Sequence, residues 1–145
     1  MRHTILLAAS VLAFVNAPAP ARACNDHVEV VAPSPRKVTV AQLRQWQETK
    51  VAHTVVDVNG AATRKKHGVI PGAVLLSSAS RFELRELPAN RNEKLVFYCA
   101  STSCTAGETA AIRAMQAGFT DVNVLPVGIT GWKAAGQKTD RVPRS

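Results

Sequence analysis

The sequence predicts an α/β domain in which a mainly parallel β-sheet lies between two layers of helices. Short apolar runs rich in β-branched residues, which are typical of fully buried parallel strands, recur along the chain. Segments with helical spacing separate these runs, so that strands and helices alternate. The 145 residues, 46% of them hydrophobic, are enough for one domain with a buried core.

The first 23 residues have the layout of a cleavable secretory signal. A basic residue stands near the start, an apolar core covers residues 5–15, and a small-x-small ending covers residues 21–23. This core is much shorter than the ~20 residues that cross a bilayer, so no membrane span is expected. Cys24 follows the predicted cleavage site, but Ala21 and Arg22 do not fit a lipoprotein signal, which argues against lipid anchoring. We therefore expect an exported, periplasmic protein.

The first elements after the signal follow the alternation. Residues 24–36 contain two prolines and predict an extended N-terminal arm. After Thr39, apolar and amphipathic residues recur at helical spacing and predict a helix. The β-branched run at 53–58 predicts a buried strand, and the polar residues 60–68 predict a short helix or a loop.

The second half continues the same pattern. A turn is expected at 70–73, where proline and glycine are adjacent, and a buried strand at 73–76. Charged and apolar residues alternate over 81–87 and stop at a proline, which predicts a short helix. Strands are expected at 94–99 and 121–125, with a helix over 106–118 between them that ends at a glycine.

Cys99 closes the predicted strand 94–99 and opens a loop rich in small hydroxyl residues. In parallel sheets ligands bind beyond the carboxyl ends of the strands. A free thiol has a pKa of about 8.5, and backbone N–H groups near a helix N-terminus favour the reactive thiolate. We predict Cys99 as a nucleophile, the alternative being a buried cysteine that acts as a small hydrophobe. The backbone predicted to bind a small oxyanion is that of Ala100, Ser101, Thr102, Ser103 and Thr105.

Thr105 and Glu108 have the spacing of a helix capping box. In such a box the threonine side chain accepts from the N–H of Glu108, and the glutamate side chain reaches back to the N–H of Thr105. We therefore expect Glu108 to be a structural residue and not an acid or base.

Cys104 stands five positions after Cys99, and three roles are open for it. It can pack as a small residue under the loop. It can act as a resolving thiol that forms a disulfide with Cys99, which an exported location favours. The third role, a soft-metal site with His27, His53 or His67, lacks the usual ligand spacing, so no metal is predicted. Pairing with Cys24 is a further alternative.

The net charge of +8 is spread along the chain. Its densest cluster is Arg64, Lys65, Lys66 and His67, which is short and poor in flanking aromatic residues. Nucleic-acid binding is therefore not expected. A solvated surface is favoured over an anion-attracting role near a pocket.

The segments "VVDVN", "HGVIPGAVLL", "KLVFYC" with its loop and "AGFTDVNVLPVGITGW" together resemble the rhodanese family of sulfurtransferases over residues 37–136. The resemblance implies a rhodanese-like three-layer α/β/α fold with a mainly parallel five-stranded sheet over residues 37–137, followed by a tail over 138–145. It also implies that Asp57 and the "GVIPGA" turn support the sheet and the pocket rim, and that Trp132 packs in the core.

The chemistry that the resemblance implies is persulfide transfer. Cys99 would take a sulfane sulfur from thiosulfate or a related donor and pass it to a thiophilic acceptor such as cyanide or a thiol; no cofactor is implied. Family loops commonly carry glycine, and often arginine or lysine, within the six residues that begin at the cysteine, whereas "CASTSC" has neither. Related phosphatases carry an arginine where Thr105 stands, which argues against that activity.

Three functional hypotheses follow. The first is an exported sulfurtransferase with Cys99 as the sulfur carrier, a small sulfur-containing anion or a persulfide as the donor, and a thiol as the acceptor. The second is a thiol/disulfide protein that uses Cys99 and Cys104 with a redox partner protein. The third is a binding module that keeps the fold without the chemistry.

Overall fold

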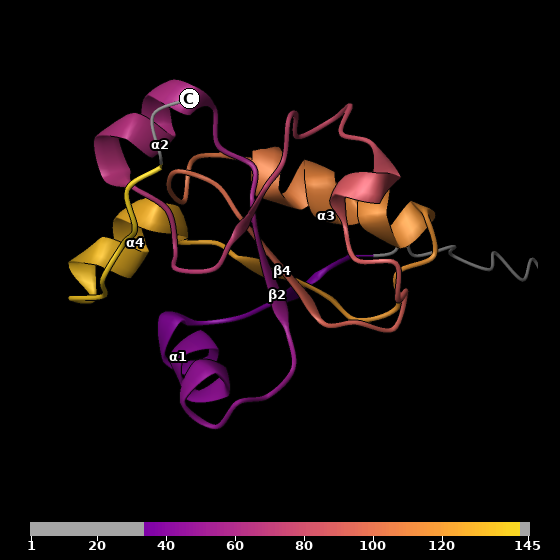
Figure 1. Ribbon diagram of the computed structural model, residues 1–145, viewed down its shortest axis with the longest axis horizontal. Coiled ribbons are helices and arrows are strands. Elements are labelled where there is room, and N and C mark those ends of the chain that lie inside the picture. The colour runs from indigo at the N-terminus through magenta and orange to yellow at the C-terminus, as the bar shows by residue number, and fades with distance from the viewer. Residues whose placement is uncertain (1–33, 143–145) are drawn as a thin grey trace, which may run out of the picture. The chain divides into compact units, whose positions relative to one another are not determined.

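The computed structural model describes residues 34–142, which form a sheet with helices on both faces (Figure 1). The predicted signal over residues 1–23, with Cys24 and His27, lies outside the described residues. Of the predicted arm only residues 34–36 are described, and they lead into the first strand.

The sheet has five parallel strands in the order β1-β5-β4-β2-β3. In chain order they are β1 (Arg36–Lys37), β2 (Thr54–Asp57), β3 (Val74–Leu75), β4 (Leu95–Tyr98) and β5 (Val122–Leu125). The centre of the sheet is β4, which pairs with β2 on one side and with β5 on the other. The predicted parallel α/β fold is therefore confirmed.

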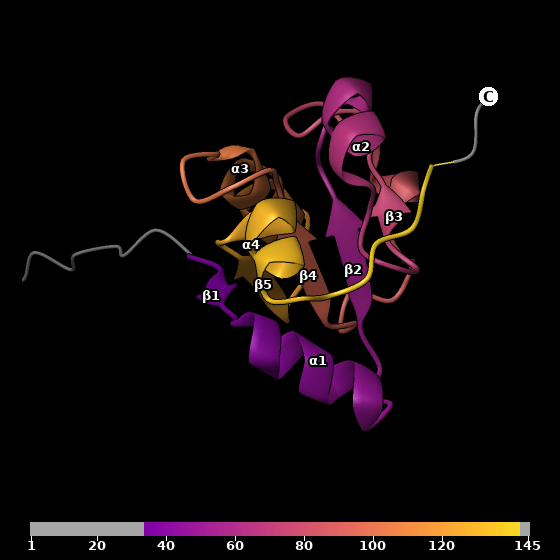
Figure 2. The same cartoon turned by 90° about the vertical axis from the view of Figure 1, so that its left-hand side faces the viewer.

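Alternation along the central strands divides the core between the two faces of the sheet. Val56, Phe97 and Val124 belong to a cluster that packs against α3 (Ala106–Gln116). Their neighbours Val96 and Leu125 belong to a second cluster, to which α1 (Val40–Glu48) and α4 (Gly128–Ala134) contribute buried residues. Because successive side chains of a strand point to opposite faces, both faces of β4 are buried. Figures 1 and 2 show α1 and α3 on opposite sides of this sheet.

Helix α1 begins directly after Thr39, as predicted. Thr39 caps α1, since its side chain accepts from the N–H of Gln42 while the Gln42 side chain accepts from the N–H of Thr39. The polar segment 60–68 forms α2 (Ala61–His67), which ends at Gly68 with a φ of +76°. Small alanines on α3 let that helix approach the sheet closely.

Two elements depart clearly from the prediction. The strand expected at 73–76 is only β3, and it is an edge strand with Leu75 37% exposed, because it pairs with β2 alone. The helix expected at 81–87 is one 3-10 turn, η1 (Leu84–Glu86). Its Glu86 carboxylate accepts from the N–H groups of Ser77 and Glu83, which holds the chain in a turn. Those hydrogen bonds, first that of Ser77, also lower the pKa of Glu86.

Within residues 34–142, the structure has no helix with the length and apolar character that crossing a membrane requires.

Candidate active site

Cys99 directly follows β4 at the carboxyl edge of the sheet. The last pair on that strand sets Tyr98 beside Asp57 of β2 and beside Leu125 of β5. Cys99 is 7% exposed, and the chain then turns away from the sheet as the loop Cys99–Thr105. The cysteine therefore lies where parallel α/β sheets bind ligands.

The first turn of α4 holds this loop. The N–H of Ile129 donates to the carbonyl of Cys99 at 2.9 Å, and the N–H of Thr130 donates to the carbonyl of Ala100 at 3.0 Å. The Thr130 hydroxyl adds a second bond to the carbonyl of Ala100, also at 3.0 Å. Because the peptide bonds are trans and planar, the N–H groups of Ala100 and Ser101 point away from α4. Two carbonyls of the loop are thus satisfied by the helix, and the adjacent N–H groups face the other side.

Gly128 makes this contact sterically possible. Its φ is +59°, which side chains rarely adopt, and a Cβ there would lie 2.5 Å from the carbonyl oxygen of Cys99. The helix α4 was not predicted from the sequence. The local signal that marks it is Gly128, the glycine that opens "GITGW".

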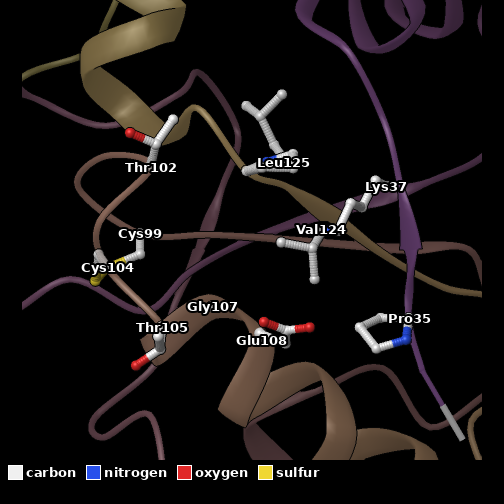
Figure 3. Close-up of a pocket in the computed structure, with 11 residues that line it drawn as sticks. Pro35, Lys37, Cys99, Thr102, Cys104, Thr105, Gly107, Glu108, Val124 and Leu125 are labelled. Atoms are coloured by element: carbon white, nitrogen blue, oxygen red, sulfur yellow. A yellow bond between two sulfur atoms is a disulfide. The ribbon is translucent and has the colours of Figure 1, made fainter.

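A disulfide joins Cys99 to Cys104, with 6.2 Å between their Cα atoms (Figure 3). A turn closes the loop, since the N–H of Cys104 donates to the carbonyl of Ser101 at 3.1 Å. Cys104 is partly exposed, whereas Cys99 is buried. Of the pairings considered for Cys104, the structure shows the disulfide with Cys99.

A small cavity of about 130 Å³ opens beside the disulfide. The floor and walls come from β1, β5, the loop and the first turn of α3 (Figure 3). Among the residues predicted to form the cradle, Thr102 and Thr105 line it, whereas Ala100, Ser101 and Ser103 do not. The full lining is Pro35, Lys37, Cys99, Thr102, Cys104, Thr105, Gly107, Glu108, Val124, Leu125 and Pro126.

The predicted capping box of Thr105 and Glu108 is wrong. Thr105 has helical backbone angles, with φ −87° and ψ −5°, and its side chain makes no capping hydrogen bond. A box needs an extended residue at the cap, as Thr39 has with φ −91° and ψ 163°. Thr105 instead accepts through its carbonyl from the N–H of Thr109 at 3.0 Å. Glu108 is left exposed in the first turn of α3, with its side chain at the cavity.

Lys37 brings a cation to the cavity that the sequence analysis did not find. The loop itself carries no lysine or arginine, and Lys37 comes from β1. Its place follows from strand pairing, since Lys37 is in register with Val124 of β5, which lines the same cavity. No local sequence signal marks this pairing between distant segments.

Asp57 is fully buried beneath the carboxyl edge of the sheet and is held by several groups. It accepts from the N–H of Asn59 at 2.7 Å, from Nε of Arg64 at 3.1 Å and from the hydroxyl of Tyr98. Arg64 also donates to the carbonyl of Leu76 at 2.9 Å, which links α2 to the end of β3. Burial, and then the negative charge of Asp57, raise the pKa of Tyr98 above its ordinary value.

The remaining predicted residues lie away from the cavity. Trp132 is 3% exposed in the core cluster under α4, and its Nε1 donates to the carbonyl of Lys138 at 2.8 Å. His53 and His67 do not line the cavity, and neither do the basic residues of α2. Among residues 34–142, no group of three or more His, Cys, Asp or Glu side chains is placed to hold a metal ion.

Comparisons with known proteins show the family and support the fold. Residues 39–135 match the family model described as "Rhodanese-like domain". A rhodanese-related protein from Thermoplasma volcanium is 25% identical over 71% of this chain and 95% of its own, with a TM-score of 0.58. The rhodanese-like domain of an Anabaena protein is 24% identical over 78% of this chain and 87% of its own, with a TM-score of 0.59.

A third similar structure has a different description. It is a Rhodopseudomonas palustris protein of unknown function described as a possible tyrosine phosphatase, 21% identical over 73% of this chain and 85% of its own, with a TM-score of 0.60. At this identity the likeness concerns the fold alone. A comparison with curated protein sequences found no significant match. Since the family model covers most of the described residues, the chain belongs to the family of rhodanese-like domains.

Proposed function

We propose that this protein is a sulfurtransferase that carries a sulfane sulfur as a persulfide on Cys99 and passes it to a thiol. The observation that carries the proposal is the loop held by α4. In the described part of the chain, the backbone N–H groups of Ala100, Ser101, Thr102 and Ser103 donate no backbone hydrogen bond. Such groups favour a thiolate or a persulfide anion at Cys99 over the neutral form.

The transfer takes two displacement steps and needs Cys99 in its reduced form. A dithiol reductant first supplies two electrons and opens the disulfide. The Cys99 thiolate then attacks the outer sulfur of a donor R–S–SH, which forms the Cys99 S–S bond, breaks the donor S–S bond and releases R–S⁻. In the second step an acceptor thiolate attacks that outer sulfur, and Cys99 leaves as a thiolate. Neither step changes the net oxidation state.

A second candidate function is thiol/disulfide exchange, and the Cys99–Cys104 disulfide favours it. In this alternative Cys104 attacks the inner sulfur of a Cys99 persulfide, forms the disulfide and expels hydrosulfide. A redox partner protein would then reduce the pair again. The two candidates differ in whether Cys104 is required.

Phosphatase activity has less support from the same cavity. Its lining, among the described residues, includes no arginine to clamp a phosphate, and it includes the carboxylate of Glu108. A doubly charged phosphate would be attracted by Lys37 but repelled by that carboxylate, so the two side chains together give it no net charge to bind.

Intact mass spectrometry tests the proposal. The protein is reduced, freed of reductant and incubated with thiosulfate or with a small-molecule persulfide. One added sulfur is expected in the wild type and in Cys104→Ser, and none in Cys99→Ser. A wild-type protein that gains no sulfur from any donor overturns the proposal. Sulfur that is gained and lost again as hydrosulfide, only when Cys104 is present, favours the second candidate.

We also propose that the protein acts outside the cytoplasm, on the basis of the signal expected over residues 1–23. Fractionation of cells that express the full chain should recover it from the periplasm with residues 1–23 removed. Full-length protein in the cytoplasmic fraction contradicts this location.

A further inference from the structure

The cavity beside the disulfide carries one positive and one negative side chain. Lys37 comes from β1, and Glu108 comes from the first turn of α3 (Figure 3). Both residues are exposed, and within residues 34–142 neither side chain forms an ion pair or a hydrogen bond. The adjacent Arg36, by contrast, is paired with Asp121. In the described part of the chain, these two charges have no protein partner and are open to a ligand that enters the cavity.

The volume limits the ligand to a small molecule. The cavity has a volume of about 130 Å³. Drug-sized ligands need about 300 Å³ or more. Lys37 and Glu108 line the same cavity as Cys99 and Cys104, the two residues of the disulfide.

We propose that Lys37 and Glu108 select a zwitterionic aminothiol of low molecular weight, a cysteine-like molecule, as the acceptor at this site. Lys37 binds the carboxylate of the aminothiol, and Glu108 binds its ammonium group. This substrate class rests on the proposed sulfur transfer. A ligand with two negative charges gains one attraction from Lys37 and meets one repulsion from Glu108, so a zwitterion fits the charges better.

The reaction with the aminothiol is balanced without another reactant. Its thiolate attacks the outer sulfur of the Cys99 persulfide, the S–S bond of Cys99 breaks, and the products are the aminothiol persulfide and the Cys99 thiolate. In the oxidised protein the same thiolate attacks a sulfur of the Cys99–Cys104 disulfide. That attack forms a mixed disulfide and releases the other cysteine as a thiolate.

Four thiols with different charges test the selection. L-Cysteine carries both groups, cysteamine lacks the carboxylate, 3-mercaptopropionate lacks the ammonium group, and 2-mercaptoethanol lacks both. Sulfur-loaded protein is mixed with each thiol at equal thiolate concentration, and the rate of sulfur loss is followed by intact mass. L-Cysteine is expected to be fastest and 2-mercaptoethanol slowest. Each missing charge should cost about two- to fivefold, the range for exposed ion pairs.

Variants assign each contact to one side chain. Lys37→Gln should slow L-cysteine and 3-mercaptopropionate by about two- to fivefold and leave cysteamine unchanged. Glu108→Gln should slow L-cysteine and cysteamine and leave 3-mercaptopropionate unchanged. Lys66→Gln and Glu48→Gln change the same charges on α2 and α1, away from the cavity, and should leave all four rates as in the wild type.

The selection is overturned if the four thiols react equally, or if Lys37→Gln slows all of them alike. If the proposed function itself is wrong, the result is different, because no donor will then add a sulfur to Cys99. In that case the same four thiols are compared in opening the disulfide of the oxidised protein, with mixed-disulfide formation as the readout. An equal rate for all four in this assay also overturns the selection.

Discussion

Gly128 has no side chain, and for that reason the loop after Cys99 can lie against the first turn of α4. The residue meets two requirements at once, a φ of +59° and a backbone carbonyl 2.5 Å from where a Cβ would stand. Gly136, at the other end of α4, shares only the first requirement. Its φ is +72°, and nothing lies within 4 Å of its Cβ position. Substitutions at the two glycines therefore distinguish the effect of backbone strain from that of steric overlap.

Gly128→Ala should destabilise the protein more than Gly136→Ala. Both variants take on the left-handed backbone penalty of about 1–2 kcal/mol. Gly128→Ala adds an overlap with the loop that costs about 1–3 kcal/mol more. Unfolding in urea, followed by circular dichroism, measures the two free energies. If the two variants lose equal stability, the close contact between Gly128 and the loop does not matter.

Gly128→Ala and Gly136→Ala should also differ in their reaction with a sulfur donor. Because the overlap is with the carbonyls of Cys99 and Ala100, Gly128→Ala should also slow sulfur loading of Cys99, whereas Gly136→Ala should not. Intact mass after brief exposure to a persulfide donor gives this rate. Loading that is unchanged in folded Gly128→Ala would show that the clamp by α4 does not position the loop for reaction.

At the scale of the elements, two threonines before helices have different roles. Thr39 is extended and caps α1 through a reciprocal pair of hydrogen bonds with Gln42. Thr105 is already helical and makes no side-chain cap bond with α3. Both threonines have the spacing of a capping box, so the spacing alone does not decide whether a capping box forms. The backbone conformation of the threonine distinguishes the two cases, and the spacing of the motif does not encode it.

Thr39→Ala should therefore cost about 1 kcal/mol of unfolding free energy, the usual loss for an N-cap. Thr105→Ala should stay within about 0.5 kcal/mol of the wild type, as surface substitutions usually do. Thermal unfolding of the two variants measures the difference. If Thr105→Ala lost as much unfolding free energy as Thr39→Ala, Thr105 would act as a helix cap after all.

The strands were predictable because their signal is local. The runs that became β2, β4 and β5 are mostly apolar, as strands buried on both faces usually are, although Asp57 of β2 and Asn123 of β5 are buried polar residues. The two-residue strands β1 and β3 carry no such signal; β1 was missed, and β3 was wrongly expected to be buried. The helix α4 was missed as well, since it begins at a glycine whose conformation depends on a contact with the loop of Cys99.

At the scale of the whole molecule, the cavity joins parts of the chain that only the sheet topology brings together. Cys99, Cys104, Thr102 and Thr105 were accessible to sequence reasoning because they share one loop. Lys37 was not, because its place depends on the pairing of β1 with β5 at one edge of the sheet. The positive charge that the loop lacks is thus supplied by Lys37, which strand pairing places at the cavity.

Asp121 links β1 to the segments beside it at the β1–β5 edge of the sheet. It accepts from Lys94 at 2.7 Å and from Asn123 at 2.8 Å, and it also accepts from Arg36 of β1. Burial disfavours its charged form, but the hydrogen bonds from Lys94, Asn123 and Arg36 together outweigh burial and lower the pKa of Asp121 below its ordinary value. A carboxylate with a lowered pKa in the folded state stabilises that state above its ordinary pKa, and the contribution is lost as the pH falls through the folded pKa.

Asp121→Asn should therefore be less stable than the wild type at neutral pH, by about 1 kcal/mol or less because the group lies near the surface. The difference should hold above about pH 4 and shrink below it, as the wild-type carboxyl takes up a proton. Urea unfolding at a series of pH values measures it. Glu48→Gln removes a carboxylate whose one ion pair is exposed and should show a smaller difference from the wild type. A deficit of Asp121→Asn that keeps its full size in acid would mean that the charge of Asp121 does not stabilise this edge, and that β1 with Lys37 is held in place by packing and backbone hydrogen bonds alone.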